Sequence, residues 1–452
     1  MRISTFRLVA SLACLVAAPA AFPKSLLVIS VDGMRPDYVT KADEHHLRIP
    51  NLRQMMKSGT FAEGVIGVVP TVTYPSHTTM MTGVPPAGHG IYTNTFFDPE
   101  RKNLNGWYWF SEDFKVPTLW DAAHRAGLTT ASINWPVTVG AKIDYLIPEI
   151  WRAGTPEDLK LLRPLSTPGM LAQFEKELGP YANELDATLP NDVLRAKFAA
   201  AIIRKYKPKF TTVHLAALDH AEHLSGPFSE HANEVMEGDD KLVGELRDAA
   251  LAADPEATIC VVSDHGFLPV THHLNLARAF MDAGLFHASS HRTQFGVQTI
   301  DQWTAMPWNN GGSAAIVLKN PSDKTAFDKV SALLKRLAAD PANGINRIVD
   351  QKELKKMGAF PTAQFLVDMK SGYQVEFSLD GPLLRQVPPS GTHGYLPEHP
   401  ELRSAFFISG PGIAKAKDLD VINMLQIAPT LAGVLRVSLP DAHAAKLAIS
   451  SK

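Results

Sequence analysis

The sequence predicts an α/β protein built on a mostly parallel sheet with helices on both faces. Short apolar and β-branched runs alternate with amphipathic helical patterns, and this alternation is typical of such sheets. The chain has 452 residues, of which 45% are hydrophobic, so it can bury a large core. The predicted strands are 25–31, 128–134, 210–218, 258–263, 314–318 and 405–409. The predicted helices are 51–58, 117–126, 193–206, 230–252, 324–339 and 424–435.

Two stretches interrupt this alternation. Residues 85–114 are rich in glycine, asparagine and aromatic residues, which predicts a long structured loop near the ligand end of the sheet. Its aromatic side chains either pack on one another or form a wall of the substrate site. Residues of about 310–385 show a strand, helix, strand and hairpin pattern. We expect a small inserted α+β subdomain there, within a single catalytic domain that spans 21–452.

The first twenty residues match a cleavable signal peptide. Arg2 and Arg7 precede an apolar stretch over 8–18, and small residues follow at 18–20. The stretch is too short to span a bilayer, so we expect export to the periplasm or the medium. Cleavage removes Cys14 and leaves Cys260 as the only thiol, which lies in an apolar strand and is expected to be a small buried hydrophobe.

Overall charge does not indicate a polyanionic partner. The chain has 44 basic and 46 acidic residues and a formal net charge of −2. No strong field therefore attracts a nucleic acid polymer or an anionic membrane. We expect a small-molecule substrate that is selected by a local site.

Acidic and histidine side chains follow several predicted strands. Asp32 and Asp264 each end an apolar run, and open α/β sheets bind ligands at the carboxyl ends of their strands. Asp219 and His223 follow strand 210–218 at helical spacing, so both can hold one cation. His393 stands in a glycine turn over 391–394. Three carboxylates and three imidazoles form a ligand set suited to zinc; they are Asp32, Asp219, His223, Asp264, His265 and His393.

Each of these pairs alone is also typical of loop caps or surface residues. The joint pattern is much rarer, because every member follows a strand or a glycine turn. A single shared metal site is therefore the favoured interpretation. His77, His89, His220 and Glu222 are expected to make structural or orienting hydrogen bonds instead.

The segment over 70–83 carries a specific resemblance. Its sequence, Pro70-Thr71-Val72-Thr73-Tyr74-Pro75-Ser76-His77 followed by a short helix and Thr82-Gly83, resembles the nucleophile segment of the nucleotide pyrophosphatase/phosphodiesterase (type I phosphodiesterase) family of the alkaline phosphatase superfamily. Thr73 falls on the nucleophile position. Further motifs follow the same order over nearly all of the chain after residue 20, at 31–38, 88–94, 219–227, 263–266 and 391–394. The resemblance implies an alkaline phosphatase-like fold.

The resemblance also implies a two-zinc site. One Zn²⁺ is expected on Asp219, His223 and His393, and the second on Asp32, Asp264, His265 and the Thr73 oxygen. A threonine hydroxyl is a poor nucleophile, but a divalent cation stabilises its alkoxide. Two cations about 4 Å apart can clamp the attacking and leaving oxygens of an in-line phosphoryl transfer. The implied reaction proceeds through a covalent phosphothreonine.

Two further positions concern the substrate. Asn94 and the backbone amide of Tyr74 match the groups that bind a phosphoryl oxygen in this family, so Asn94 is expected to be catalytic. The Tyr74 ring matches one face of a nucleobase clamp. Relatives that cleave nucleotides commonly have tyrosine on the other face, where this chain has His214. We therefore list Tyr74, Asn94 and His214 as substrate-binding candidates, and phosphodiester hydrolysis is a firmer expectation than a nucleotide substrate.

The sequence thus predicts an exported zinc-dependent phosphodiesterase or nucleotide pyrophosphatase. Phosphonoacetate hydrolase-like cleavage and phosphomonoesterase activity on the same scaffold stay open, as does a non-enzymatic metal-binding relative. Sulfate ester hydrolysis is disfavoured, because residues 73–77 lack the nucleophile type and the arginine that sulfatases carry.

Overall fold

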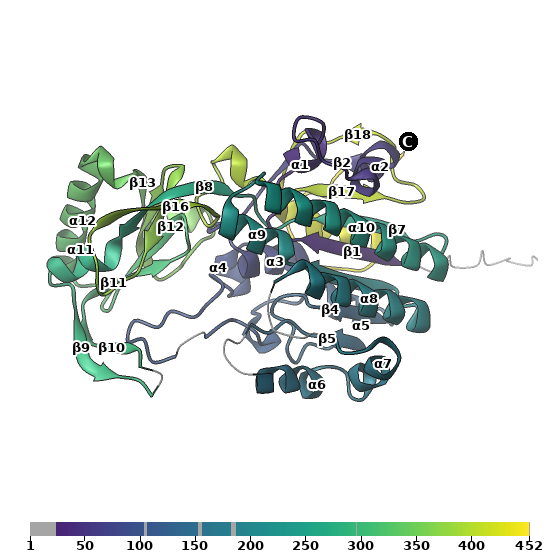
Figure 1. Ribbon diagram of the computed structural model, residues 1–452, viewed down its shortest axis with the longest axis horizontal. Helices are drawn as coiled ribbons and strands as arrows, with labels where there is room; N and C mark the ends of the chain where they lie inside the picture. The colour runs from purple at the N-terminus through teal and green to yellow at the C-terminus, as the bar shows by residue number, and fades with distance from the viewer. Residues whose placement is uncertain (1–23, 104–105, 152–155, 182–186, 295, 452) are drawn as a thin grey trace, which may run out of the picture.

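The computed structural model describes residues 24–103, 106–151, 156–181, 187–294 and 296–451 (Figure 1). The predicted signal peptide at 1–20 lies outside these residues. Within the described ranges, no helix has the length and apolar character needed to cross a membrane.

An eight-stranded sheet forms the centre of the described structure, in the order β18-β2-β17-β7-β1-β6-β4-β5. β1 (Leu26–Val31) runs parallel to both β6 (Phe210–Leu215) and β7 (Thr258–Val262). β4 (Thr130–Ile133) and β5 (Tyr145–Ile147) extend the parallel part beyond β6. β17 (Phe406–Ser409) pairs antiparallel with β7. The predicted mostly parallel sheet is confirmed, with an antiparallel strand toward one edge.

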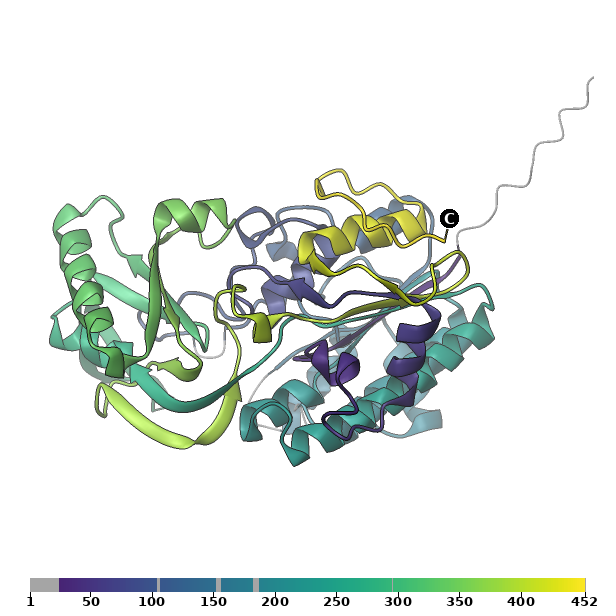
Figure 2. The ribbon, with the colours of Figure 1, turned by 90° about the horizontal axis from the view of Figure 1, so that it is seen from above.

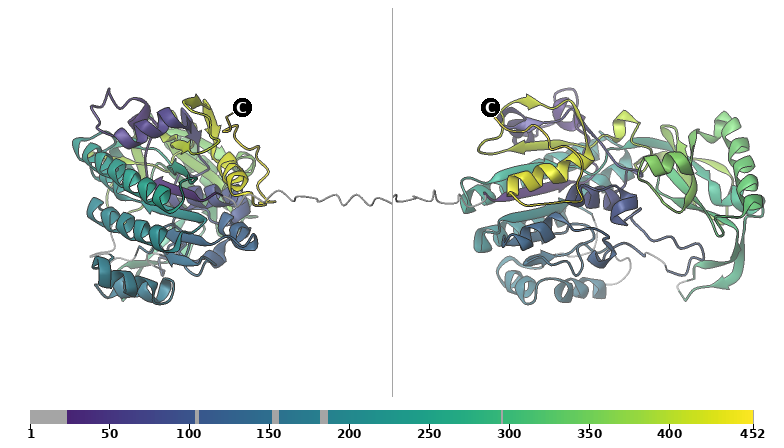
Figure 3. Two further views of the ribbon diagram at one scale, coloured as in Figure 1. Left: turned by 90° about the vertical axis from the view of Figure 1, so that its right-hand side faces the viewer. Right: turned by 180° about the vertical axis from the view of Figure 1, so that it is seen from behind.

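Helices cover both faces of this sheet (Figures 2 and 3). Alternate residues of β1 point to opposite sides, so Leu27, Ile29 and Val31 face one core while Leu26 and Val28 face the other. The first core contains side chains of α2 (Pro50–Ser58), α8 (Leu189–Tyr206) and α10 (Glu230–Ala253). The second contains side chains of α3 (Thr73–Thr82), α5 (Leu119–Arg125) and α14 (Ile427–Leu435). A strand buried on both faces explains why β1 reads as a continuous apolar run.

A second lobe lies beyond the carboxyl ends of the parallel strands (left in Figure 1). It has an antiparallel sheet of β11 (Ala305–Asn309), β12 (Ser313–Leu318), β14 (Ala363–Met369) and β13 (Ile345–Asp350). Beside it lie β8 (Leu268–Asn275), β15 (Gly372–Glu376) and β16 (Leu384–Thr392), the hairpin of β9 (Phe286–Arg292) and β10 (Gln298–Trp303), and helices α11 (Leu276–Asp282) and α12 (Lys324–Ala339). These elements extend from 268 to 392, a wider range than the predicted 310–385. Whether they form a separate inserted subdomain stays a prediction.

The shorter elements connect these layers. They are α1 (Asp37–Thr40), β2 (Thr60–Phe61), β3 (Gly64–Ile66), α4 (Pro86–His89), α6 (Leu162–Leu165), α7 (Met170–Leu178), α9 (Ala217–Ser225), α13 (Gln351–Lys356), β18 (Lys417–Asp418) and β19 (Val421–Asn423).

His89, at the end of α4, gives a pH-dependent prediction. It is fully buried, and its Nδ1 accepts from the Ile91 N–H (3.1 Å) while its Nε2 lies 3.1 Å from Thr79 Oγ1. Burial lowers its pKa from 6.5 to about 3. Below pH 6.5 the His89 side chain therefore binds a proton in the unfolded chain but not in the folded protein. The contribution of neutral His89 to stability is complete above pH 6.5 and is lost as the pH falls toward 3. For one such group, the free energy of unfolding falls by about 1.4 kcal/mol between pH 7.5 and pH 5.5.

Urea unfolding at these two pH values, beside His89→Gln, checks this expectation. The stability difference between the two pH values should be about 1.4 kcal/mol smaller in the variant. An identical difference in both proteins contradicts the assignment.

Candidate metal centre

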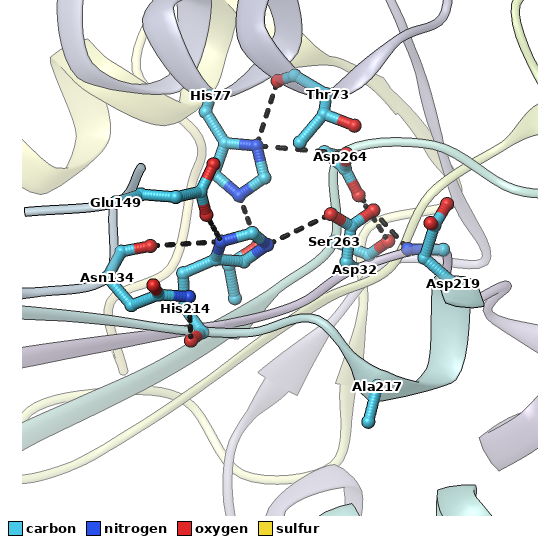
Figure 4. A network of polar contacts seen from close by, with 12 residues as sticks. Asp32, Thr73, His77, Asn134, Glu149, His214, Ala217, Asp219, Ser263 and Asp264 are labelled. Carbon is cyan, nitrogen blue, oxygen red and sulfur yellow. Dashed lines mark hydrogen bonds and ion pairs between the residues drawn. The ribbon is translucent and has the colours of Figure 1, made fainter. Parts of the chain in front are cut away.

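The carboxyl ends of three neighbouring parallel strands bring three aspartates together. Asp32 follows β1, and Asp264 follows β7 after Ser263. Asp219 lies in α9, which begins just after β6, so the expected helical turn after this strand is present. Figure 4 shows the three carboxylates lying close together, with Asp219 coming from α9. Strand order alone explains their meeting, since β7, β1 and β6 are adjacent.

Thr73 is the first residue of α3 and lies beside these carboxylates. It follows the extended residue Val72, so its side chain leaves the helix at its N-terminus. Thr73 is 8% exposed, and its Oγ1 lies 3.4 Å from His265 Nε2. The predicted nucleophile therefore lies in the same centre as the predicted ligands.

His265 Nε2 is the point on which the carboxylates converge. It lies 3.0 Å from Asp264 Oδ2, 3.4 Å from Asp32 Oδ1 and 4.0 Å from Asp219 Oδ1. The same three oxygens are buried and have no hydrogen-bond partner in the described structure. The opposite oxygens of two of these groups are engaged: Asp32 Oδ2 contacts His214 Nε2 at 2.9 Å, and Asp264 Oδ1 accepts from the Gly33 N–H at 3.1 Å.

Buried carboxylate oxygens without partners are costly unless they bind a proton or a cation. Burial and the neighbouring charges of Asp264 and Asp219 raise the pKa of Asp32 well above its usual value. Burial alone lowers the pKa of His265, but the carboxylates, Asp264 foremost, outweigh it and raise the pKa to about 9. Positive charge is thus favoured at this point, and a divalent cation meets the same demand.

His393 and His223 lie on the Asp219 side of the centre. His393 Nε2 and His223 Nε2 are each 3.6 Å from Asp219 Oδ1, and the rings of His393 and His265 stack with centroids 3.7 Å apart. The Nδ1 atoms are engaged elsewhere, at 3.1 Å from the Thr71 carbonyl for His393 and from the Gly391 carbonyl for His223. These contacts orient both Nε2 atoms toward Asp219.

The described residues offer two groups that could hold a cation. One is Asp32, Asp264 and His265, and the other is Asp219, His265 and His393. His265 belongs to both, while His223 lies next to the second group. The division of ligands between two cations stays a prediction, as do the number and identity of the ions.

The glycine turn at His393 is needed for close approach. Gly394 has φ +83°, and a Cβ there would lie 1.6 Å from the Asn310 carbonyl oxygen. Any side chain at this position would displace the His393 backbone. This agrees with the prediction that glycine is needed for the turn that carries His393.

Asn94 contacts the start of α3. Its Oδ1 accepts from the backbone N–H of Tyr74 at 2.9 Å, so the two groups expected to bind a phosphoryl oxygen are neighbours. The Tyr74 ring is fully buried and packs with Ile91, Tyr108 and Val137, with Trp107 at 5.2 Å between ring centroids. The loop over 85–114 therefore packs its aromatic residues on Tyr74. This ring does not offer a free face for stacking on a base, and only the backbone amide stays a substrate-binding candidate.

The predicted substrate contact of His214 does not fit its position. His214 is 1% exposed and lies behind Asp32, with Nδ1 2.6 Å from Glu149 Oε2 and 3.0 Å from the Asn134 carbonyl. A ring enclosed in this way cannot stack on a ligand. It contacts the centre through Asp32 instead (Figure 4).

Sequence reasoning did not identify Glu149 or Asn134. Glu149 follows β5 and Asn134 follows β4, so both stand at the same sheet edge as the aspartates. The run over 145–147 is short and was not recognised as a strand. A strand assignment there would have pointed to Glu149 as another carboxylate at the ligand edge.

The architecture and the centre define a class of α/β protein in which a cation-binding group of acids and histidines lies beside a threonine at a helix N-terminus. The model of the type I phosphodiesterase/nucleotide pyrophosphatase family matches residues 26–396. The chain belongs to this family, which confirms the resemblance seen in its motifs.

Known relatives agree with this membership. An uncharacterized pyrophosphatase/phosphodiesterase of Schizosaccharomyces pombe is 26% identical over 55% of this chain and 46% of its own length. Human ectonucleotide pyrophosphatase/phosphodiesterase family member 1 is 27% identical, over 55% of this chain and 24% of its length. A venom phosphodiesterase of Crotalus durissus collilineatus is 22% identical over 93% of this chain and 45% of its length. The chain thus spans less than half the length of these curated relatives.

A solved structure shows the fold. Human ectonucleotide pyrophosphatase/phosphodiesterase 5 superposes with a TM-score of 0.64 at 21% identity, covering 92% of this chain and 95% of that one. The predicted alkaline phosphatase-like fold is confirmed.

Proposed function

We propose that this protein is an exported, metal-dependent phosphodiesterase that hydrolyses small phosphodiesters through Thr73. The observation that carries the proposal is the convergence on His265 Nε2 of three buried carboxylate oxygens that have no hydrogen-bond partner among the described residues; this nitrogen lies 3.4 Å from Thr73 Oγ1. Carboxylates, imidazoles and one hydroxyl around a common point suit Zn²⁺. The resemblance to the family implies two such ions.

The residues that would hold the cations are Asp32, Thr73, Asp219, His223, Asp264, His265 and His393. Bound divalent cations would lower the pKa of the Thr73 hydroxyl and neutralise charge on the transferred phosphoryl group. The chain's own contribution is to hold Thr73 Oγ1 at the end of α3 and to exclude water from its surroundings, since Thr73 is 8% exposed.

The reaction has two displacements. Thr73 Oγ1, after losing its proton to solvent, attacks phosphorus, and the bond to one ester oxygen breaks so that the first alcohol leaves and takes up a proton. Water then attacks the phosphothreonine, and the bond between phosphorus and Thr73 Oγ1 breaks to release the phosphomonoester. Each step exchanges one phosphorus–oxygen bond for another.

Three relatives support the proposal by their descriptions. Murine ectonucleotide pyrophosphatase/phosphodiesterase 5 is described as inactive in a threonine-to-alanine variant, in complex with AMP. The ecto- and venom enzymes among the relatives suit the export that residues 1–20 predict.

A substrate panel tests the reaction class. Zinc-loaded protein is assayed with chromogenic phosphodiester, phosphomonoester, phosphonate and sulfate substrates. We expect the diester to have the highest kcat/KM. Faster turnover of the monoester or the phosphonate would assign one of the alternative reactions to the same centre.

Asn94 gives a prediction on catalysis. Its side chain lies at the start of α3 and is expected to donate its amide hydrogens to a phosphoryl oxygen, so Asn94→Ala should lower kcat by roughly 100-fold, which corresponds to ~3 kcal/mol. Asn94→Asp keeps the acceptor for the Tyr74 N–H and removes the donor. It should lose as much activity as Asn94→Ala while the melting temperature stays close to that of the parent. Full activity of the aspartate variant contradicts a donor role.

A further inference from the structure

A buried chain of polar contacts runs from Glu149 through His214 to Asp32 (Figure 4). His214, near the end of β6, contacts Asp32 Oδ2 through Nε2 at 2.9 Å and Glu149 Oε2 through Nδ1 at 2.6 Å. The exposed fractions of Asp32, His214 and Glu149 are 3%, 1% and 0%. Neither the metal-ligand set nor the reaction steps account for a buried glutamate and histidine at this place.

The environment of the His214 ring fixes its Nδ1 as a donor. Nδ1 faces two acceptors, Glu149 Oε2 and the Asn134 carbonyl at 3.0 Å, and Nε2 faces the Asp32 carboxylate. A backbone carbonyl can only accept, so Nδ1 carries a hydrogen, while Nε2 lies within hydrogen-bonding distance of Asp32 Oδ2; the ring therefore bridges Glu149 and Asp32.

Glu149 is itself held in place. Its second oxygen, Oε1, accepts from the Trp151 indole N–H at 2.8 Å. Asn134 supplies its carbonyl from a left-handed backbone conformation, φ 57°, that asparagine tolerates better than most residues. The acceptors of the ring are thus fixed by the ends of β4 and β5 before any ligand is bound.

The effect at Asp32 is directional. Its Oδ2 contacts His214, and its Oδ1 has no hydrogen-bond partner among the described residues and lies 3.4 Å from His265 Nε2. A free carboxylate rotates about its χ2 torsion, whereas this one is held with a particular oxygen toward the centre. Partners of this kind orient metal ligands and typically change cation affinity by 10- to 100-fold.

We propose that His214 and Glu149 are positioning residues that hold Asp32 with Oδ1 toward the cation, and so set the cation affinity of the centre. The inference rests on the proposed function, because it needs the centre to bind a cation. It adds two residues at 149 and 214 to the machinery and assigns to His214 a task other than substrate contact.

The test measures cation binding directly, without turnover. Co²⁺ is titrated into metal-free protein, and its visible absorption reports both affinity and the geometry of its ligands. His214→Gln should bind Co²⁺ roughly 10- to 100-fold more weakly, with an altered spectrum. Glu149→Gln keeps an acceptor for the Trp151 N–H and removes the charge, so it should show a smaller loss in the same direction.

Two controls separate positioning from packing. His89→Gln changes another fully buried, hydrogen-bonded histidine that does not contact the centre, and it should leave the Co²⁺ affinity unchanged. The double variant His214→Gln/Glu149→Gln should lose no more affinity than His214→Gln alone, because Glu149 acts through His214. Melting temperatures of all variants report folding.

The outcomes for the inference and for the proposed function differ. Parent affinity and spectrum in both His214→Gln and Glu149→Gln overturn the positioning role, even if their melting temperatures fall. Asp32→Asn serves as the reference for the centre itself. If the parent binds no Co²⁺, or if Asp32→Asn binds it as the parent does, the proposed metal centre fails together with the inference.

Discussion

Thr73→Ala is expected to lower kcat for phosphodiester hydrolysis by roughly 10,000-fold or more. Removing the nucleophile of a covalent mechanism leaves only binding and electrostatic stabilisation, so losses of this size are typical. Thr73 Oγ1 lies 3.4 Å from His265 Nε2 at the start of a ten-residue helix. Steady-state turnover of a chromogenic diester by zinc-loaded protein measures the effect.

Thr73→Ser is the matched control. It keeps the hydroxyl and removes a methyl group, so it should retain far more activity than Thr73→Ala. The covalent step has its own readout, because acid quenching during turnover should trap phosphate on the peptide that contains Thr73, detectable by mass spectrometry. If Thr73→Ala is as active as the parent, or if the phosphate is trapped on another residue, the threonine mechanism is wrong.

The sequence predicted the central sheet and the convergence of the candidate ligands, because both depend on local patterns. β1, β6 and β7 are buried on both faces and therefore read as continuous apolar runs. Asp32 and Asp264 come directly after such runs, and His393 is marked by its glycines. Adjacent parallel strands then place these side chains at one edge, so their convergence follows from strand order.

Other features could not be predicted in this way. β8 has the sequence Leu-Pro-Val-Thr-His-His-Leu-Asn, which lacks the continuous apolar run of a buried strand, although the strand pairs with β15 and β16. The burial of Tyr74 depends on the loop over 85–114, which comes to it from a distance along the chain. The contact of His214 with Glu149 joins positions 65 residues apart. Such contacts are tertiary, and no local pattern encodes them.

Removal of the bound cation is expected to abolish turnover and to lower stability. A ligand present at 100 times its Kd stabilises the folded state by about 2.7 kcal/mol, and chelation removes this gain. The chelated protein also keeps three crowded carboxylates, where burial and the charges of Asp264 and Asp219 raise the pKa of Asp32 well above its usual value. Urea unfolding with excess Zn²⁺ and with chelator measures the difference, and added Zn²⁺ should restore both stability and turnover.

Removing the charge of Asp219 should make the protein more stable than the parent without a cation and less stable with one. Asp219→Asn relieves part of the repulsion at Asp32, so in chelator this variant should be more stable than the parent by about 1 kcal/mol. With Zn²⁺ it should be less stable, because it has lost a ligand that lies 3.6 Å from both His223 and His393. Asp43→Asn alters an exposed carboxylate that is paired with Arg53 and belongs to neither candidate cation-binding group, so it should show no such reversal. A variant less stable than the parent in both conditions would mean that Asp219 supports the fold and not a cation, because only cation binding makes the same carboxylate costly when alone and stabilising when loaded.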